Sequence, residues 1–121
     1  MSNEKEQKTQ SPLEIRFFHD CQTAGLLVEL QYPIAELHAD FAIVKEKIVI
    51  ECDSKEFHSD WKAIENDKLR DSIYAYEGWD VIRLSGEDIY KNGEKIAHAI
   101  KQAIKDGNVN LYRSYIEEEE N

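Results

Sequence analysis

Carboxylates and a histidine stand close together in the stretch HADFAIVKEKIVIECDSKEFHSD, which covers residues 38–60. Asp40, Glu51 and Asp53 lie within or beside runs of residues typical of buried β-strands. Side chains on a strand alternate between its two faces, so Glu51 and Asp53 share one face. Carboxylates held close together repel one another and need a cation. Oxygen ligands with at most one imidazole nearby favour Mg²⁺ or Mn²⁺ over zinc.

The elements that must position these side chains follow one another without an internal repeat. The periodicity of apolar residues predicts helices over residues 12–24, 60–77 and 94–105. It predicts strands over residues 26–32, 35–44, 47–53 and 79–84, with a hairpin turn at 44–47. The predicted order is therefore αβββαβα, which is an α/β fold with a central sheet flanked by helices.

The first predicted helix has well-defined ends and an apolar stripe. Ser11 is a candidate N-cap, Pro12 takes the first helical position, and Gly25 ends the helix. Glu14 stands three residues after Ser11, as in a capping box. The residues at spacings of three and four that we expect to be buried are Leu13, Phe17, Cys21 and Ala24.

The second predicted helix also carries an apolar arc, and it contains two charged residues. The arc consists of Trp61, Ile64, Leu69, Ile73 and Tyr76. Glu65 and Lys68 fall inside it, which has two explanations. They form an i,i+3 ion pair at the margin of the core, or Lys68 reaches a phosphate of a bound nucleic acid.

The length and composition favour one domain. A chain of 121 residues that is 41% hydrophobic fits a single domain, which we place at residues 11–107. The polar residues 1–10 and the acidic residues 108–121 are expected to be a disordered segment and a solvated tail. No apolar run is long enough to span a membrane, so we expect a soluble, cytoplasmic protein. Cys21 and Cys52 have no partner at zinc-ligand spacing and are expected to be buried, reduced thiols.

The net charge is unfavourable for a nucleic-acid partner, because phosphate binding needs clustered Lys and Arg. Of the formal charge of -10, residues 117–120 contribute -4, which leaves -6 for the rest of the chain. The folded part is thus moderately acidic. Binding of DNA would benefit from a DNA-binding partner protein or from a homodimer.

Taken together, these residues resemble the PD-(D/E)XK nuclease superfamily, whose restriction-endonuclease-like core has the same αβββαβα order. Within it, the resemblance is to the branch of very-short-patch repair endonucleases, the catalytic domains of some phage homing endonucleases and small bacterial relatives. It runs from about residue 11 to residue 104. The matching pieces are the SPLE helix start, Ala39-Asp40-Phe41, Glu51-Cys52-Asp53, His58, Arg70 and GWDVIRLSGEDI.

The resemblance implies a role for each acid of the strand pair. Asp40 corresponds to the metal-binding aspartate and Glu51 to the acid of the central strand. The superfamily has a lysine two residues after that acid, whereas this chain has Asp53. We expect Asp53 and the carbonyl oxygen of Cys52 to be further metal ligands. The very-short-patch-like branch uses a histidine in place of the lysine, and His58 matches it.

Glu14 and His58 keep two interpretations each. Glu14 matches an acid of the branch that contacts the metal or its waters, but a capping box with Ser11 explains it equally well. His58 is either the general base for water or an ordinary histidine before a helix. Arg70 matches a basic residue of the family, which we expect to bind phosphate alongside Lys68.

The function predicted from these residues is that of a Mg²⁺-dependent (or Mn²⁺-dependent) DNA endonuclease, in a bacterial or phage-infected cell. Attack of water on the phosphodiester would leave a 5′-phosphate. The alternative is a catalytically silent nuclease fold that serves protein interaction or assembly, which the acidic charge and Asp53 favour. The presence of Asp40, Glu51 and His58 together favours the nuclease.

Overall fold

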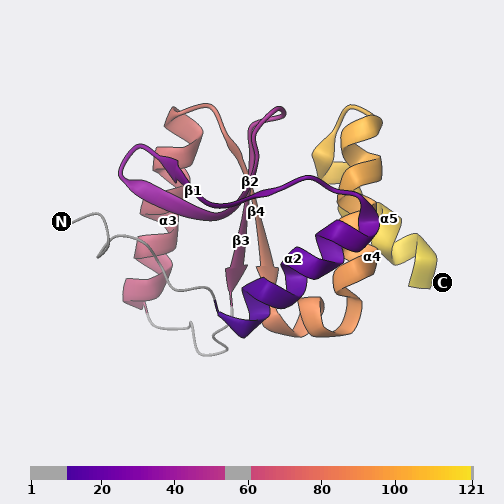
Figure 1. Cartoon of the computed structure of the whole chain (residues 1–121). Coiled ribbons are helices and arrows are strands. Elements are labelled where there is room, and N and C mark those ends of the chain that lie inside the picture. Colours follow the sequence, from indigo (N-terminus) through magenta and orange to yellow (C-terminus); the bar gives the residue numbers. More distant parts are fainter. Residues whose placement is uncertain (1–10, 54–60, 121) are drawn as a thin grey trace.

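The computed structural model describes residues 11–53 and 61–120. It has the mixed α/β architecture expected from the sequence, with a four-stranded sheet flanked by helices (Figure 1). In chain order the elements are α2 (Pro12–Ala24), β1 (Glu29–Ile34), β2 (Leu37–Ile43), β3 (Ile48–Asp53), α3 (Trp61–Tyr76), β4 (Asp80–Ser85), α4 (Gly86–Lys105), η1 (Val109–Leu111) and α5 (Tyr112–Glu120).

The strands follow one another across the sheet in the order β1-β2-β3-β4. The pairs β1–β2 and β2–β3 are antiparallel, and a turn over residues 44–47 joins the second pair, as predicted. The pair β3–β4 is parallel, and α3 forms the crossover that a parallel connection requires. The carboxyl ends of β3 and β4 therefore lie at the same edge of the sheet, where α2 also begins (Figure 1).

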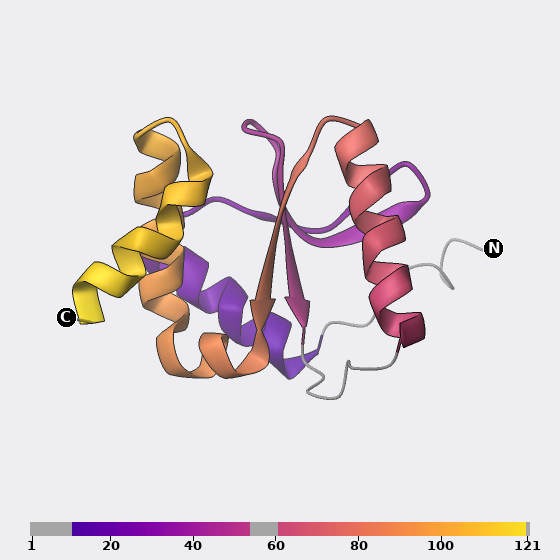
Figure 2. The same cartoon turned by 180° about the vertical axis from the view of Figure 1, so that it is seen from behind.

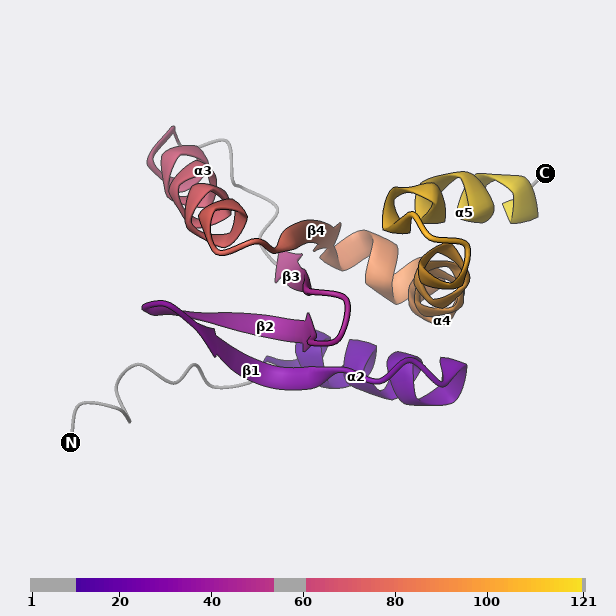
Figure 3. The same ribbon diagram turned by 90° about the horizontal axis from the view of Figure 1, so that it is seen from above.

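Helices cover both faces of the sheet. Viewed from above, α3 lies on one face, α2 and α4 lie on the other, and α5 packs beside α4 (Figure 3). The larger apolar cluster joins α2 and α4 to the sheet through residues such as Phe17, Phe41 and Ile100. A smaller cluster lies under α3 and includes Val49, Tyr74 and Trp79. The sheet thus separates the core into two unequal layers.

The ends of α2 have the capping chemistry predicted from the sequence. Ser11 Oγ accepts a hydrogen bond from the Glu14 N–H at 3.2 Å, and Pro12 is the first helical residue. Gly25 closes the helix with φ of +77°, a conformation that costs glycine little. The predicted stripe is buried, and it consists of Leu13, Phe17, Cys21 and Ala24.

The last long helix begins earlier than predicted. α4 starts at Gly86 and not at residue 94, and Ser85 Oγ caps it by accepting the Asp88 N–H at 3.1 Å. Asn92 has non-helical backbone angles, φ -137° and ψ 25°, so the helix is kinked there. The apolar periodicity detected only the part after the kink, because a kink changes the direction in which side chains face.

The chain continues in ordered structure beyond the predicted domain boundary at residue 107. Val109 and Tyr112 are buried in the larger cluster, and α5 follows them. Figure 2 shows α5 lying against α4 on the side away from α3. The apolar residues before the glutamates thus tie this segment to the core.

In the part of the chain that the structure describes, no helix has the length and apolar character needed to cross a membrane.

Candidate active site

Three buried carboxylates stand out among the described residues. Glu14, Asp40 and Glu51 are only 8%, 3% and 5% exposed. They come from the first turn of α2, from β2 and from β3, near the edge where β3 ends (Figure 1). Charged side chains are rarely buried unless they are paired or bind a metal. This part of the molecule is therefore the candidate active site.

Asp40 and Glu51 meet where the ladder between β2 and β3 ends. That ladder runs from the pair Ile43 and Ile48 to the pair Phe41 and Ile50, and the next step places Asp40 opposite Glu51. At this step the carboxylates of Asp40 and Glu51 accept hydrogen bonds from backbone N–H groups of the neighbouring strand. The Asp40 N–H donates to Glu51 Oε2 at 3.3 Å, and the Cys52 N–H donates to Asp40 Oδ2 at 2.9 Å. Each carboxylate is thus oriented by the backbone of the neighbouring strand.

Helix α3, on the face of the sheet opposite α2 and α4, holds the Glu51 carboxylate. Arg70 Nη2 lies 3.1 Å from Glu51 Oε1 in an ion pair, and Tyr74 Oη donates to Glu51 Oε2 at 3.1 Å. Arg70 also donates to Tyr74 Oη at 3.0 Å. Burial, with the charge of Glu51 adding to it, raises the pKa of Tyr74. The phenol is therefore a protonated donor at neutral pH, and the Glu51 carboxylate accepts its hydrogen bond.

These contacts give Arg70 a position that the sequence did not predict. We expected a phosphate ligand, and instead the guanidinium binds Glu51 and donates to the His38 carbonyl oxygen at 3.4 Å. Its observed partners belong to the protein's own site. A contact between Arg70 and phosphate stays a prediction.

The apolar arc predicted for α3 is wrong. Trp61 and Tyr76 of that arc are 64% and 89% exposed, and Ile64 and Leu69 are exposed too. The helix is turned so that Arg70 and Tyr74 face the sheet instead. Both side chains contact the buried Glu51, and a buried carboxylate is costly unless it is paired.

Lys68 lies on the exposed side of α3, away from the side that holds Glu51. In the described part of the chain no salt bridge joins it to Glu65, so the predicted i,i+3 ion pair is not formed. Its side chain faces solvent. A contact between Lys68 and phosphate stays a prediction.

Glu14 directs its side chain into the protein. Its N–H is capped by Ser11, whereas its carboxylate accepts a hydrogen bond from Gln31 Nε2 of β1 at 3.3 Å. Glu14 thus makes one bond of the predicted capping box, through its backbone N–H, and its side chain makes a second contact with a strand of the sheet. Gln31 was missed in the sequence, where the only signal was a polar residue between Leu30 and Tyr32 in a predicted strand.

The charge of these acids reaches Cys52. Burial raises the pKa of its thiol well above the ordinary value, and the charges of Asp40 and then Glu14 raise it further. Both carboxylates therefore lie close to Cys52. A thiol that keeps its proton is a poor nucleophile. Cys52 and Cys21 are both free thiols, as predicted, but only Cys21 is buried, whereas Cys52 is half-buried.

The remaining candidates lie at the end of β3 or beyond it. Asp53 is the last residue of β3, is half-buried and pairs in register with Ser85 of β4. His58, the predicted base, lies outside the described residues. The strand end thus presents Asp40, Glu51 and Asp53 at one edge of the sheet.

The donor chemistry fits a small divalent cation. Within residues 11–53 and 61–120, no three side chains of His, Cys, Asp or Glu are grouped closely enough to hold a metal by themselves. Mg²⁺, however, is usually bound through one or two carboxylates and keeps several waters. Asp40 and Glu51 supply that number of buried carboxylates, and nearby carbonyl oxygens add donors of the same kind.

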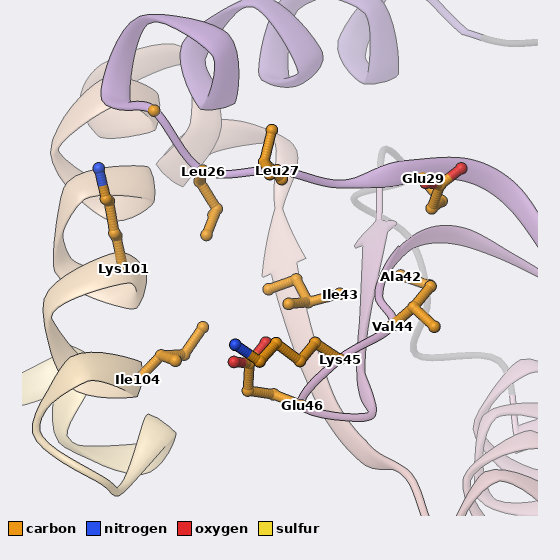
Figure 4. Close-up of a pocket in the computed structure, with 11 residues that line it drawn as sticks. Leu26, Leu27, Glu29, Ala42, Ile43, Val44, Lys45, Glu46, Lys101 and Ile104 are labelled. Atoms are coloured by element: carbon orange, nitrogen blue, oxygen red, sulfur yellow. The ribbon is translucent and has the colours of Figure 1, made fainter.

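A cavity elsewhere in the molecule is separate from this site. It has a volume of about 380 Å³ and lies between the end of α2, the β2–β3 hairpin and α4 (Figure 4). Leu26, Ile43 and Ile104 line it, and none of the three buried carboxylates does. Lys101 points toward the end of α2, where it donates to the Ala24 carbonyl oxygen at 3.4 Å (Figure 4). The acids that do line it, Glu29 and Glu46, are exposed and belong to neither the buried group nor the end of β3.

The αβββαβα order, the mixed sheet and the buried acids at the end of β3 define a restriction-endonuclease-like fold. The chain belongs to the restriction-endonuclease-like family REase_MTES_1575, whose family model matches residues 14–104. This is a nuclease-type family. The match spans the elements from α2 to α4 and includes all three buried carboxylates. No curated protein and no solved structure matched the chain.

Proposed function

We propose that the protein is a Mg²⁺-dependent endodeoxyribonuclease that hydrolyses phosphodiester bonds of DNA. The observation that carries the proposal is the pair of buried acids, Asp40 and Glu51, held across the end of the β2–β3 ladder. A protein of a nuclease-type family has reason to bury and orient two acids at this edge. A plain scaffold would place apolar residues there, because buried charges rarely stabilise a fold.

Asp40 and Glu51 would hold the cation, with Asp53 and the Cys52 carbonyl oxygen as further ligands. The bound cation would polarise the phosphodiester and lower the pKa of the attacking water. Arg70 and Tyr74 contact the Glu51 carboxylate and hold it in place. A carboxylate oriented in advance need not be reorganised when the substrate binds.

His58 is the proposed general base. It takes a proton from the attacking water, the new P–O bond forms, and the bond to the 3′-oxygen breaks. The departing 3′-oxygen takes a proton from solvent, to which the imidazolium returns the first proton. The products are a 5′-phosphate and a 3′-hydroxyl. An imidazole is suited to this role because its ordinary pKa lies near neutral pH. This assignment rests on the resemblance to the very-short-patch-like branch, in which a histidine replaces the strand lysine; here Asp53 occupies that lysine's position.

Partners and context follow from charge and size. We infer that a DNA-binding partner protein or a homodimer assists substrate binding, because the chain carries a formal charge of -10. Lys68, on the exposed side of α3, is the proposed contact to the DNA backbone. The place of action would be the cytoplasm of a bacterial or phage-infected cell, without a membrane partner.

The proposal is tested by incubating purified protein with duplex and nicked DNA in the presence of Mg²⁺ or Mn²⁺. We expect cleavage that EDTA abolishes and that is lost in Asp40→Ala and Glu51→Ala. Glu46→Ala, on the exposed β2–β3 hairpin, is the matched control and keeps full activity. Cleavage that persists in both site variants would contradict the proposed mechanism.

A catalytically silent module for protein interaction is the second candidate. The ion pair between Arg70 and Glu51 favours it, because Glu51 has a cationic partner within the protein itself. Thermal denaturation separates the two candidates. A silent module gains no stability from millimolar Mg²⁺ or Mn²⁺, whereas an intact cation site raises Tm.

A further inference from the structure

Gln31 has an unusual backbone conformation for a residue within a strand. Its φ is +48°, a value that residues other than glycine rarely adopt. The usual alternation of side chains breaks at this position. Leu30 packs on the larger apolar cluster and Tyr32 on the smaller one, although residues two apart in a strand ordinarily share a face. The strand thus changes its facing at Gln31.

The side-chain amide of Gln31 is only half used. Nε2 donates to Glu14 Oε1 at 3.3 Å, whereas Oε1 is buried and accepts no hydrogen bond from the residues that the structure describes. Buried polar atoms nearly always have a partner, so an unused amide oxygen indicates a ligand or water at that point. Being neutral, this oxygen adds an acceptor without adding repulsion between charges.

The position of Gln31 places this oxygen beside the proposed site. Leu30 pairs with Phe41 and Tyr32 pairs with Ala39, so Gln31 stands opposite Asp40. Glu14 contacts it from α2. Gln31 therefore lies between two acids of the site.

We propose that Gln31 is a positioning residue of the cation site, where its amide oxygen accepts a hydrogen bond from the cation's hydration shell while its amide nitrogen holds Glu14. Mg²⁺ and Mn²⁺ retain waters in protein sites, and amide oxygens are suitable acceptors for them. The need to aim this amide explains why β1 keeps a strained backbone at residue 31. This inference rests on the proposed function.

Binding of Mn²⁺ alone, measured by calorimetry on the full chain, tests the inference without reference to activity. Gln31→Gly removes the amide and adopts the positive φ without strain, so it should fold. We expect its Kd for Mn²⁺ to rise about tenfold, as is typical when a residue that supports a metal site is lost. Gln31→Asn, which tolerates the same backbone but is one methylene shorter, should also bind more weakly. Gln22→Ala, on the exposed side of α2, is the control and should bind as the wild type does.

The outcomes separate this inference from the proposed function. Equal Mn²⁺ affinity in wild type, Gln31→Gly and Gln31→Asn would overturn the role of Gln31 and leave the proposed site intact. The Gln31 variants could instead have a lower Tm than the wild type, by the same amount with and without Mn²⁺, while their Kd for Mn²⁺ is unchanged. That result would show that Gln31 has a structural role only, and it would also overturn the proposal. Absence of Mn²⁺ binding in the wild type would contradict the proposed site itself.

Discussion

Asp40 and Glu51 stand opposite one another where the β2–β3 ladder ends, and the Asp40 N–H donates to Glu51 Oε2 over 3.3 Å. Among the described residues, strands and a helix supply the contacts that orient both carboxylates. Asp40 is held by the Cys52 N–H of the neighbouring strand, and Glu51 is held by Arg70 of α3. Sites built on strands and helices are held more rigidly than sites on loops. The predictions below follow from these contacts.

The first prediction concerns the ion pair between Arg70 and Glu51. Arg70→Met leaves a buried carboxylate without its cation, so we expect the free energy of unfolding to fall by about 2–3 kcal/mol. Urea denaturation measures it. In a Glu51→Gln background the same substitution should cost less, because the charge is gone. Lys91→Met, which removes an exposed i,i+4 pair with Glu87, is the control and should change little.

The second prediction concerns the Tyr74 hydroxyl, which is buried and donates to Glu51. Tyr74→Phe keeps the ring and removes two hydrogen bonds, the one that the hydroxyl donates to Glu51 and the one that it accepts from Arg70. We expect a loss of about 1.5–3 kcal/mol, measured by urea denaturation. Tyr76→Phe serves as the matched control, because the Tyr76 side chain is exposed on the same helix. Equal effects of the two substitutions would mean that the Glu51 contact does not stabilise the protein.

The third prediction concerns pH and Asp20. Burial raises the pKa of Asp20 above its ordinary value of 3.8, Glu94 adds to this, and Arg16 opposes it. The folded protein therefore binds this proton more tightly than the unfolded chain, so its contribution to stability falls as the pH rises from about 3.8. Asp20→Asn should raise Tm at pH 7, with an advantage that shrinks toward pH 4. Thermal denaturation across this range measures it, and a constant difference would contradict the prediction.

The fourth prediction concerns His58 in the proposed reaction. His58→Ala should lower kcat by about 10²–10⁴-fold, the usual contribution of a general base. The Kd for Mn²⁺ should stay unchanged, since the histidine acts on water and the acids hold the cation. His98→Ala, on the exposed part of α4, is the control for activity. A loss of Mn²⁺ affinity that matches the loss of rate would instead make His58 a metal ligand.

The fifth prediction concerns Lys68 and the DNA backbone. Lys68→Ala should weaken DNA binding for all sequences alike and reduce the slope of log K against log salt by about one. Filter binding at several salt concentrations measures this slope. Lys105→Ala, at the far end of α4, should leave it unchanged. An unchanged slope for Lys68→Ala would remove this residue from the interface.

Much of the fold was predictable because its signals are local. Ser11, Pro12 and Gly25 mark the ends of α2, and the turn at residues 44–47 separates two strongly apolar strands. The pairing of Asp40 with Glu51 followed from the antiparallel hairpin that this turn creates. Local chemistry therefore predicted both the order of the elements and the meeting of two acids.

The orientation of α3 was not predictable, because it depends on a charge in another element. Periodicity alone selected Trp61 and Leu69 for burial, whereas the ion pair with Glu51 turns Arg70 and Tyr74 inward. Gln31 was missed for a similar reason. Its role depends on a backbone conformation that is unusual for its residue type and on a contact with Glu14, 17 residues earlier in the chain.

The central claim is that Asp40 and Glu51 hold a divalent cation, and a crystal of the protein soaked in Mn²⁺ tests it most directly. Anomalous scattering identifies the manganese without reference to any substrate. We expect an anomalous peak between the carboxylates of Asp40 and Glu51 in the wild type, and no such peak in crystals of Asp40→Ala. A fully soaked wild-type crystal with no peak at these two side chains would contradict it.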